Sequence, residues 1–477
     1  MLFTSLQYIF FFLPILLLAL KYLSHLNFKY ILGFFIISSL YFYSVWDIRF
    51  LFLLIFSIIF NFFVGKNILK TKNKKFYLYI GIFVNVSVLA YFKYRNFIIE
   101  NANVIFSSNF DLSYIVFPLA LSFYTIQQIA FLVDCYDEKI KEINFTTYAL
   151  FISFFPQLIA GPIVLYKDAY HQYKKETFYE NNFKNLYLGI IIFSIGISKK
   201  ILLADSFSIP VNEAFGQSYY TWQFIDAWIA SILFTMQIYF DFSGYTDMAI
   251  GAALLFNIYL PINFNSPLKS LSIISFWQKW HMTLSNFINQ YCFYKIIKKF
   301  HIKNTFIQYF TILFVMTIAG LWHGPTWGFV MFGVVHGIAL IINHIWKSFK
   351  FALPNIINWF FTFIVVNVGF VFFRSPNLDI SLSILKKMFD PIGFKNFILQ
   401  VLDTREFSIY GLSKITTFSP TVFYTSVISL LIIFFCKNSS DLIRNYKFKI
   451  YHLFFYSFIL VLSILRIRGV EFIYFEF

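Results

Sequence analysis

The chain has 477 residues, of which 59% are hydrophobic and 13% are charged, and its mean hydropathy is +0.70. Soluble domains are about 45–50% apolar and about 25% charged, so this composition excludes a water-soluble fold. The formal net charge of +16 comes from lysines and arginines in short clusters between apolar runs. Such clusters are typical of the cytoplasmic loops of membrane proteins, and we expect a lipid bilayer and no nucleic acid as the partner of this surface.

Apolar runs that could cross or enter a bilayer follow one another along the whole chain. Their apolarity is continuous and does not alternate, so they predict helices and not barrel strands. At about 20 residues for each crossing, we predict an all-α, polytopic integral membrane protein. It would have about ten to twelve transmembrane or re-entrant helices in a single domain, residues 1–477. The runs lie near residues 6–20, 31–46, 50–65, 77–92, 115–133, 149–165, 186–203, 225–259, 306–322, 327–346, 356–373, 421–436 and 453–468.

Two of these runs contain helix-breaking residues and are predicted to include re-entrant or half-length pieces. They are 149–165, with Pro156 and Pro162, and 225–259, with Gly244 and Gly251. Such breaks are tolerated at membrane depth only where the backbone is buried in protein or lines a cavity. Residues 375–420 form the longest weakly apolar stretch, and we expect an extramembrane excursion there.

The polar stretches between the runs predict loops and an orientation. Residues 166–185 and 261–304 are expected to be loops or interfacial helices. Lysines gather in the loops 21–29 and 66–75, which places both loops inside and the N-terminus outside. The first run, 6–20, has no basic region before it and no small-residue cleavage pattern after it, so we expect a retained span.

Placing polar side chains inside apolar segments costs free energy, so such side chains need a partner or a cavity. His323 is the foremost of them, because it stands between Trp322 and Trp327 with glycines around it. An imidazole there would meet little water, stay neutral and be able to accept a proton from a hydroxyl. The alternative is a histidine that is hydrogen-bonded between helices for packing.

Two further histidines lie in the same motifs. His281 stands between Trp280 and Thr283 in an aromatic and basic context. It could orient a substrate or assist His323 as a second catalytic residue, or it could have a structural role near the membrane surface. His336 follows His323 by thirteen residues, and the residues between them are interpreted as one helical run. This spacing places the two histidines on different faces of the helix, so we interpret His336 as structural.

Three charged residues near these motifs could support them. Asp241 and Asp247 stand in or beside an apolar run, where one could hold a histidine or lysine in place. Alternatively, neighbouring tyrosine and threonine hydroxyls could satisfy both acids. Lys279 could attract a phosphorylated donor, although a lone lysine more often extends toward the interface.

Several classes of site are argued against by what the sequence lacks. It contains no G-x-S-x-G elbow, Walker-type loop, H-E-x-x-H helix or G-x-G-x-x-G fingerprint, which demotes hydrolases, ATPases, zinc proteases and dinucleotide enzymes. The three cysteines, at 135, 292 and 436, are too few and too scattered for a disulfide framework. We expect no metal site and no bound cofactor.

Eight segments, in this order, closely resemble the membrane-bound O-acyltransferase superfamily. The similarity is to its bacterial branch, which includes the membrane proteins of alginate and peptidoglycan O-acetylation, and it spans nearly the whole chain. The segments are Tyr91–Phe97, Ser122–Gln128, Phe154–Pro162, Asp241–Ala249, Phe276–Ser285, Gly320–Gly324, Phe372–Arg374 and Phe472–Phe477.

The resemblance implies helices around a central funnel in the bacterial inner membrane and a catalytic role for His323. It also implies acetyl-CoA as the acyl donor on the cytoplasmic side and a separate periplasmic acetyltransferase as partner. Relatives commonly carry an Arg-Asp-Tyr and a Gly-Gly-Asn-Arg loop after the Trp-His motif. Here Asn289-Gln-Tyr291 leads instead into Lys295–Lys299.

The leading hypothesis is therefore O-acetylation of a cell-envelope polysaccharide such as peptidoglycan or an exopolysaccharide. One alternative is a teichoic-acid D-alanyl transferase, which shares the architecture. Another is a polysaccharide transporter or flippase without catalysis, in which Asp241, Asp247 and His323 would form an ion or substrate path.

Overall fold

The computed structural model describes residues 1–23, 26–112, 115–174, 182–216, 222–403, 413–444, 449–467, 469–470 and 472–473. Within these ranges every regular element is a helix, which confirms the all-α prediction. Six of the described helices are long and apolar enough to cross a membrane, and four shorter apolar helices accompany them. The six are Ile48–Lys70, Lys74–Phe106, Phe183–Ala214, Thr305–His323, Trp327–Ser348 and Asn355–Arg374.

The residues form two units, each packed within itself. The first unit comprises Met1–Ile197, Tyr245–Ile262 and Lys447–Leu465, and the second comprises Ser198–Gly244, Asn263–Tyr446 and Arg466–Phe477. The predicted single domain and the central funnel stay predictions.

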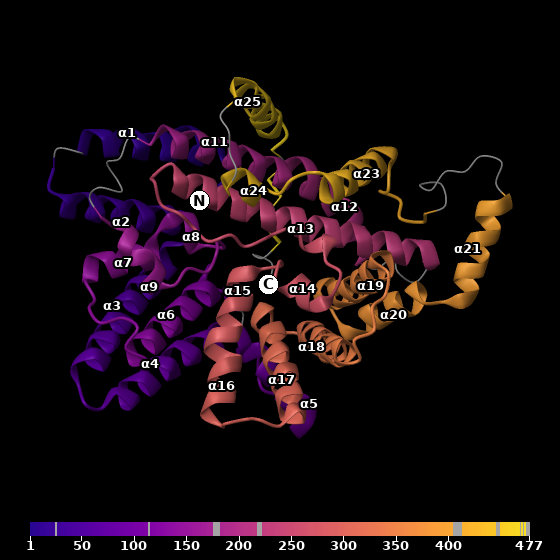
Figure 1. The fold of residues 1–477 in the computed structure, drawn as a ribbon, viewed down its shortest axis with the longest axis horizontal. Helices are drawn as coiled ribbons and strands as arrows, with labels where there is room; N and C mark the ends of the chain where they lie inside the picture. The colour runs from indigo at the N-terminus through magenta and orange to yellow at the C-terminus, as the bar shows by residue number, and fades with distance from the viewer. Residues whose placement is uncertain are drawn as a thin grey trace. The chain divides into compact units, whose positions relative to one another are not determined.

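The first unit contains the helices coloured from indigo to magenta in Figure 1, together with a helix near the C-terminus. Asparagine and aspartate side chains begin several of them. Asn27, Asp47 and Asn144 each accept a hydrogen bond from a backbone N–H of the first turn, as helix N-caps do. The helices are η1 (Tyr8–Phe12), α1 (Leu13–Leu23), α2 (Phe28–Ser44), α3 (Ile48–Lys70), α4 (Lys74–Leu89), η2 (Ala90–Tyr94), α5 (Arg95–Phe106), α6 (Leu121–Tyr136), α7 (Phe145–Ser153), α8 (Phe155–Leu158), α9 (Tyr166–Ala169), η3 (Tyr170–Gln172), α11 (Phe183–Ser198) and α25 (Ile450–Leu465).

The second unit contains the adjacent helices α17 and α18, and α19 packs against α18 (Figure 1). Its helices are η4 (Lys199–Ala204), α12 (Asp205–Ala214), the first part of α13 (Phe224–Leu254), η6 (Pro267–Lys269), α14 (Ile273–Trp277), α15 (Met282–Phe287), η7 (Ile288–Phe293), α16 (Tyr294–Lys299), α17 (Thr305–His323), α18 (Trp327–Ser348), α19 (Asn355–Arg374), α20 (Leu378–Met388), α21 (Pro391–Asp403), α23 (Pro420–Phe435) and α24 (Ser439–Arg444).

Of the two runs predicted to be broken, only one is. Residues 149–165 divide at Phe154, between α7 and α8. The prediction for 225–259 is wrong, because α13 is one helix of 31 residues that continues through Gly244 and Gly251. Gly251 serves close packing instead: a Cβ there would lie 2.6 Å from the backbone nitrogen of Phe193, so its missing side chain lets two helices touch.

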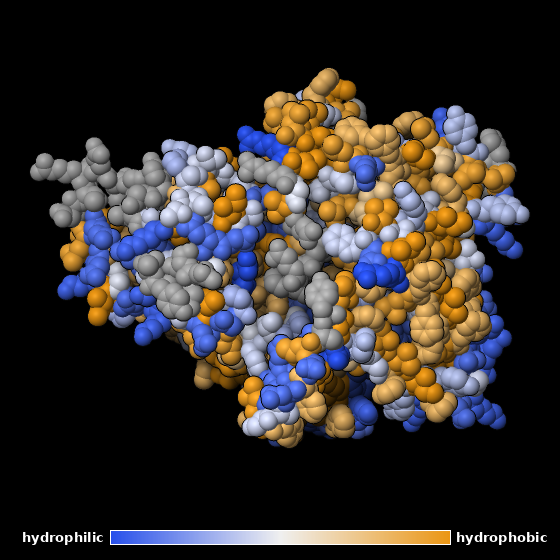
Figure 2. Space-filling view, turned by 180° about the vertical axis from the view of Figure 1, so that it is seen from behind, coloured by the Kyte–Doolittle hydropathy of each residue, from blue (hydrophilic) through white to orange (hydrophobic). Residues whose placement is uncertain are grey.

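Large apolar side chains stay exposed on the membrane-length helices. On α3, Phe52, Phe56 and Phe63 are each more than half exposed, and their spacings of four and seven residues place them on one face of the helix. Figure 2 shows apolar side chains spread over much of the visible surface. An exposed apolar face of this extent is what a lipid-facing helix presents.

Candidate active site

His323 is the last residue of α17, and its position depends on how closely α17 and α18 approach each other. Asn304 caps the start of α17 by accepting hydrogen bonds from two backbone N–H groups. A Cβ on Gly320 would lie 2.3 Å from the carbonyl oxygen of Phe329, and one on Gly333 would lie 2.3 Å from that of Met316. The glycines therefore allow backbone-to-backbone contact between the helices, which fixes His323 at the turn.

Aromatic rings surround the His323 imidazole. The ring centroids of Trp322, Phe373 and Phe332 lie 5.0, 5.2 and 5.9 Å from that of His323, and the residue is only 6% exposed. The crowded surroundings expected from sequence are therefore present. Trp327, which flanks His323 in the sequence motif, is 51% exposed.

His281 lies directly before α15 and is completely buried. Its ring centroid is 6.4 Å from that of His323 and 4.7 Å from that of Phe242 on α13, which meets it edge-on. The predicted structural role near the membrane surface did not anticipate this burial. The structure thus brings the two candidate catalytic histidines together, although 41 residues separate them in the sequence.

The hydrogen bonds of His281 identify its protonated nitrogen. Nδ1 lies 3.1 Å from Oδ1 of Asn263, and that oxygen also accepts a hydrogen bond from the backbone N–H of Thr283. Because a carboxamide oxygen cannot donate, Nδ1 carries the proton and Nε2 carries the lone pair. Burial lowers the pKa of His281 to about 3, so the ring is neutral at physiological pH.

His336 lies on α18, whereas His323 ends α17, so the reading of one continuous helical run is wrong. Gly324, Pro325 and Thr326 separate the two helices, and Gly–Pro pairs commonly stop a helix. Nδ1 of His336 accepts a hydrogen bond of 3.3 Å from Nε1 of Trp277. This bond agrees with the structural role inferred for His336.

A cavity of about 490 Å³ lies in the second unit, lined by residues of α17 and of the helices that follow His281. Tyr309, Ile312 and Met316 of α17 line it, 14, 11 and 7 residues before His323. These spacings place all three on the face of α17 that carries His323. Met282, which directly follows His281, also lines the cavity. The cavity therefore runs along α17 and reaches the residue next to His281, whereas neither His281 nor His323 lines it.

Comparison with known proteins agrees with this geometry. The model of the membrane-bound O-acyltransferase family matches residues 76–375. The chain belongs to this family. A peptidoglycan O-acetyltransferase of Helicobacter pylori is 39% identical over 86% of this chain and 84% of its own length. A probable alginate O-acetylase AlgI of Azotobacter vinelandii is 35% identical over 82% of this chain and 78% of its own length.

A third relative, a teichoic acid D-alanyltransferase of Streptococcus thermophilus, is 27% identical over 49% of this chain and 58% of its own length. The family and these relatives together show that this multi-pass membrane protein is an O-acyltransferase. The interpretation as a transporter without catalysis is thereby set aside.

Behind Phe242, the acyltransferase buries three charged side chains. Nζ of Lys200 lies 2.6 Å from Oδ1 of Asp241 and 2.8 Å from Oδ1 of Asp205. Oδ2 of Asp241 also accepts a hydrogen bond from the backbone N–H of Ile473. Of the two readings for Asp241, the structure supports the one in which it holds a lysine. Asp247 belongs to the first unit, and its role stays a prediction.

Sequence reasoning missed several residues of the site. Lys200 and Asp205 could have been found, because charged residues inside or next to the apolar run 186–203 need partners. Phe373 stands in the quoted segment Phe372–Arg374, but nothing in the sequence indicated a contact with His323. Residues 474–477 of the terminal segment lie outside the described residues. No group of three His, Cys, Asp or Glu side chains suited to a metal occurs in the described part of the chain.

Proposed function

We propose that this enzyme is an O-acetyltransferase that transfers acetyl groups for the modification of a cell-envelope polysaccharide, such as peptidoglycan or an exopolysaccharide. Acetyl-CoA is the proposed donor, and His323 and His281 are the proposed catalytic residues. The observation that carries the proposal is the pairing of these two imidazoles, with ring centroids 6.4 Å apart, in a buried aromatic setting.

The chemistry of O-acetyl transfer suits a neutral imidazole. The acceptor hydroxyl attacks the thioester carbonyl, its oxygen forms the new ester bond, and the bond from carbon to sulfur breaks. The proton of the hydroxyl passes to the imidazole and then to the departing thiolate, so an ester and a free thiol result. An imidazole that stays unprotonated at physiological pH, as burial ensures for His281, is ready for the first transfer.

The cavity offers a site for the donor. Its polar lining includes the carboxamides of Gln278, Asn286, Asn289 and Gln308 and the imidazole of His344, and no carboxylate or amine lines it among the described residues. Neutral hydrogen-bonding groups among apolar ones suit an amide-containing chain that ends in an acyl thioester. Asn289 belongs to the segment in which this sequence departs from the pattern of its relatives, so the departure falls on the cavity wall.

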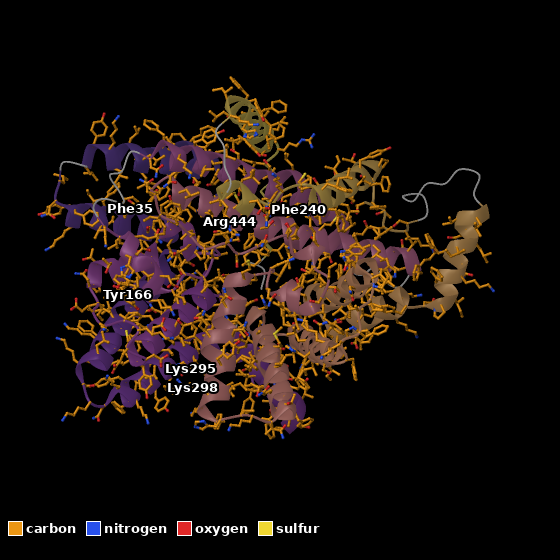
Figure 3. All side chains as sticks on the ribbon, viewed as in Figure 1. Phe35, Tyr166, Phe240, Lys295, Lys298 and Arg444 are labelled. Atoms are coloured by element: carbon orange, nitrogen blue, oxygen red, sulfur yellow. The ribbon has the colours of Figure 1, made fainter. Side chains whose placement is uncertain are left out.

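Lysines on α16 supply positive charge close to this cavity. Tyr294 of α16 lines the cavity, and Lys295 and Lys298 extend from the same short helix (Figure 3). Cationic side chains attract the phosphates of a nucleotide thioester. They also favour the cytoplasmic side, which supports delivery of the donor from the cytoplasm.

The names of the relatives support the choice of acyl group and acceptor. The two relatives that are 39% and 35% identical are named for O-acetylation, and each covers more than four fifths of the chain. The D-alanyltransferase covers only about half of it. We place the enzyme in the bacterial inner membrane, with a separate periplasmic acetyltransferase that completes transfer to the polysaccharide.

The test is the amount of ester-linked acetate on purified envelope polysaccharides. At matched protein levels, His323→Ala should remove the acetate that wild-type protein adds. His171→Ala, a histidine change in the first unit, is the control and should leave it in place. Unchanged acetate on every polysaccharide in the His323→Ala cells would overturn the proposal.

A further inference from the structure

One carboxamide organises the turn that presents His281. Oδ1 of Asn263 accepts hydrogen bonds from Nδ1 of His281 at 3.1 Å, from the backbone N–H of Thr283 at 3.1 Å and from Oγ1 of Thr283 at 2.9 Å. The backbone carbonyl of Asn263 accepts a fourth bond, from the N–H of Met282 at 2.9 Å. A single fully buried asparagine therefore holds three consecutive residues of the turn.

The backbone of His281 needs such support. Its φ of 43° and ψ of 52° lie in the left-handed region, which is unfavourable for a residue with a Cβ. Residues held in this region persist only where their surroundings over-determine them, and they cluster at functional sites. The bonds of Asn263 to the His281 ring and to the two residues that follow it provide that determination.

The convergence of donors on Oδ1 also decides the tautomer. The backbone N–H of Thr283 can only donate, so the atom that it meets must be the oxygen of Asn263 and not its nitrogen. Nδ1 of His281 must then donate to the same oxygen. The other tautomer would place a lone pair against this oxygen, which is repulsive.

Aromatic rings and a second imidazole also surround the His281 ring. Phe242 of α13 and Trp322 of α17 contribute rings, and His323 is the titratable group that faces His281. The nearest charged cluster reached through α13 is that of Lys200, Asp205 and Asp241, which pair with one another. Along its own segment, Lys279 stands two residues before His281.

We propose that Asn263 is a positioning residue for acyl transfer, because it keeps His281 in the Nδ1–H tautomer with Nε2 as the proton-accepting nitrogen. This inference rests on the proposed function. During the reaction, the acceptor hydroxyl gives its proton to Nε2 as its oxygen bonds to the acyl carbon. The imidazolium that forms donates from Nδ1 to Asn263 throughout, and Nε2 returns the proton to the leaving thiolate.

Two substitutions of Asn263 distinguish a role in orienting the His281 ring from a role in stabilising the fold. Asn263→Ala removes the oxygen and should lower kcat by about 10- to 100-fold, by analogy with the loss of a group that orients a metal-ligating histidine. Asn263→Asp keeps an oxygen acceptor and the tautomer, so it should recover much of kcat at high pH. Its negative charge favours the imidazolium and raises the pKa of His281 by about 1–3 units.

The pH profile is the decisive readout. Wild-type His281, with its pKa lowered to about 3, should add no acid limb to the rate above about pH 5. In Asn263→Asp the rate should fall with decreasing pH from a limb at least one unit higher than in wild type. Asn85→Asp, the same change at a buried carboxamide in the first unit, should leave the acid limb where it is.

The experiment uses the full-length protein in membranes, with thiol release from acetyl-CoA followed from pH 4 to 9 and normalised to folded protein. If Asn263→Asp lowers the rate equally at every pH, or if Asn263→Ala keeps the wild-type kcat, the inference is overturned. If wild-type membranes release no thiol while cells still acetylate their polysaccharide, the proposed donor fails, and the same variants are then compared by ester-linked acetate.

Discussion

The buried polar side chains of the first unit and those of the active site satisfy their hydrogen bonds in different ways. In the first unit, Asn61 and Asn85 exchange hydrogen bonds, with Nδ2 of each donating to Oδ1 of the other at 3.2 and 2.7 Å. Each also donates to the carbonyl four residues earlier, of Ser57 or Gly81. This closed, reciprocal arrangement joins α3 to α4 and contains no group that titrates near neutral pH.

Around His281 the hydrogen bonds converge on one acceptor and do not form a reciprocal pair. Three donors meet one oxygen of Asn263, and the result is an imidazole of defined tautomer on a strained backbone. A reciprocal pair stabilises a fold, whereas a convergent set orients one reactive atom. The comparison teaches that burial of polar groups alone does not mark a site, and that the direction of the hydrogen bonds does.

The largest effect on the rate should come from a substitution at His281, where the hydrogen bonds converge. His281→Ala should lower acyl transfer by about 10²- to 10⁴-fold, the usual range for loss of a general base. The rate of thiol release, normalised to folded protein, measures this. A rate within threefold of wild type would remove His281 from the catalytic group.

The charged cluster behind the site should respond as a structural element. Lys200→Met leaves Asp205 and Asp241 buried without their shared cation, and loss of one partner from a buried ion pair costs about 3–5 kcal/mol. We expect a large fall in the thermal unfolding temperature in detergent. An unchanged unfolding temperature would show that the carboxylates do not depend on this lysine.

Close helix packing should couple stability to activity. Gly333→Ala places a methyl group 2.3 Å from the carbonyl oxygen of Met316, which should destabilise the protein by about 1–3 kcal/mol through overpacking. Because α17 must shift, the rate of transfer should fall as well. Loss of stability with a wild-type rate would indicate that His323 does not depend on the contact between α17 and α18.

The smallest effect should come from the reciprocal pair. Asn85→Ala leaves Oδ1 and Nδ2 of Asn61 without this partner, and we expect a destabilisation of about 1–2 kcal/mol. The rate normalised to folded protein should match that of wild type, in contrast to the Asn263 variants. A shifted pH profile in Asn85→Ala would break the distinction between the two regions.

Sequence reasoning reached the helical, membrane-spanning character and the two histidines, because hydropathy and intramembrane polar residues are local signals. It failed where the outcome depended on contacts distant in the sequence. Gly251 looked like a break, yet it lies where a second helix approaches. His323 and His336 looked like one helical run until Gly324 and Pro325 separated α17 from α18.

The partners of the site were the least predictable part. Asn263 lies 18 residues before His281 in a stretch expected to be loop or interfacial helix, and no local pattern connects it to that histidine. The left-handed turn of the backbone at His281 brings the imidazole to Oδ1 of Asn263. Long-range geometry of this kind follows from packing and cannot be read from periodicity.

The most direct test of the account is a double-mutant cycle on the two histidines, measured as thiol release from acetyl-CoA by full-length protein in membranes. We predict that His281→Ala and His323→Ala each remove most of the rate. The double variant should be little slower than either one, because residues that act as a unit are strongly non-additive. Losses that multiply in the double variant, or a single variant with the wild-type rate, would contradict a shared catalytic site.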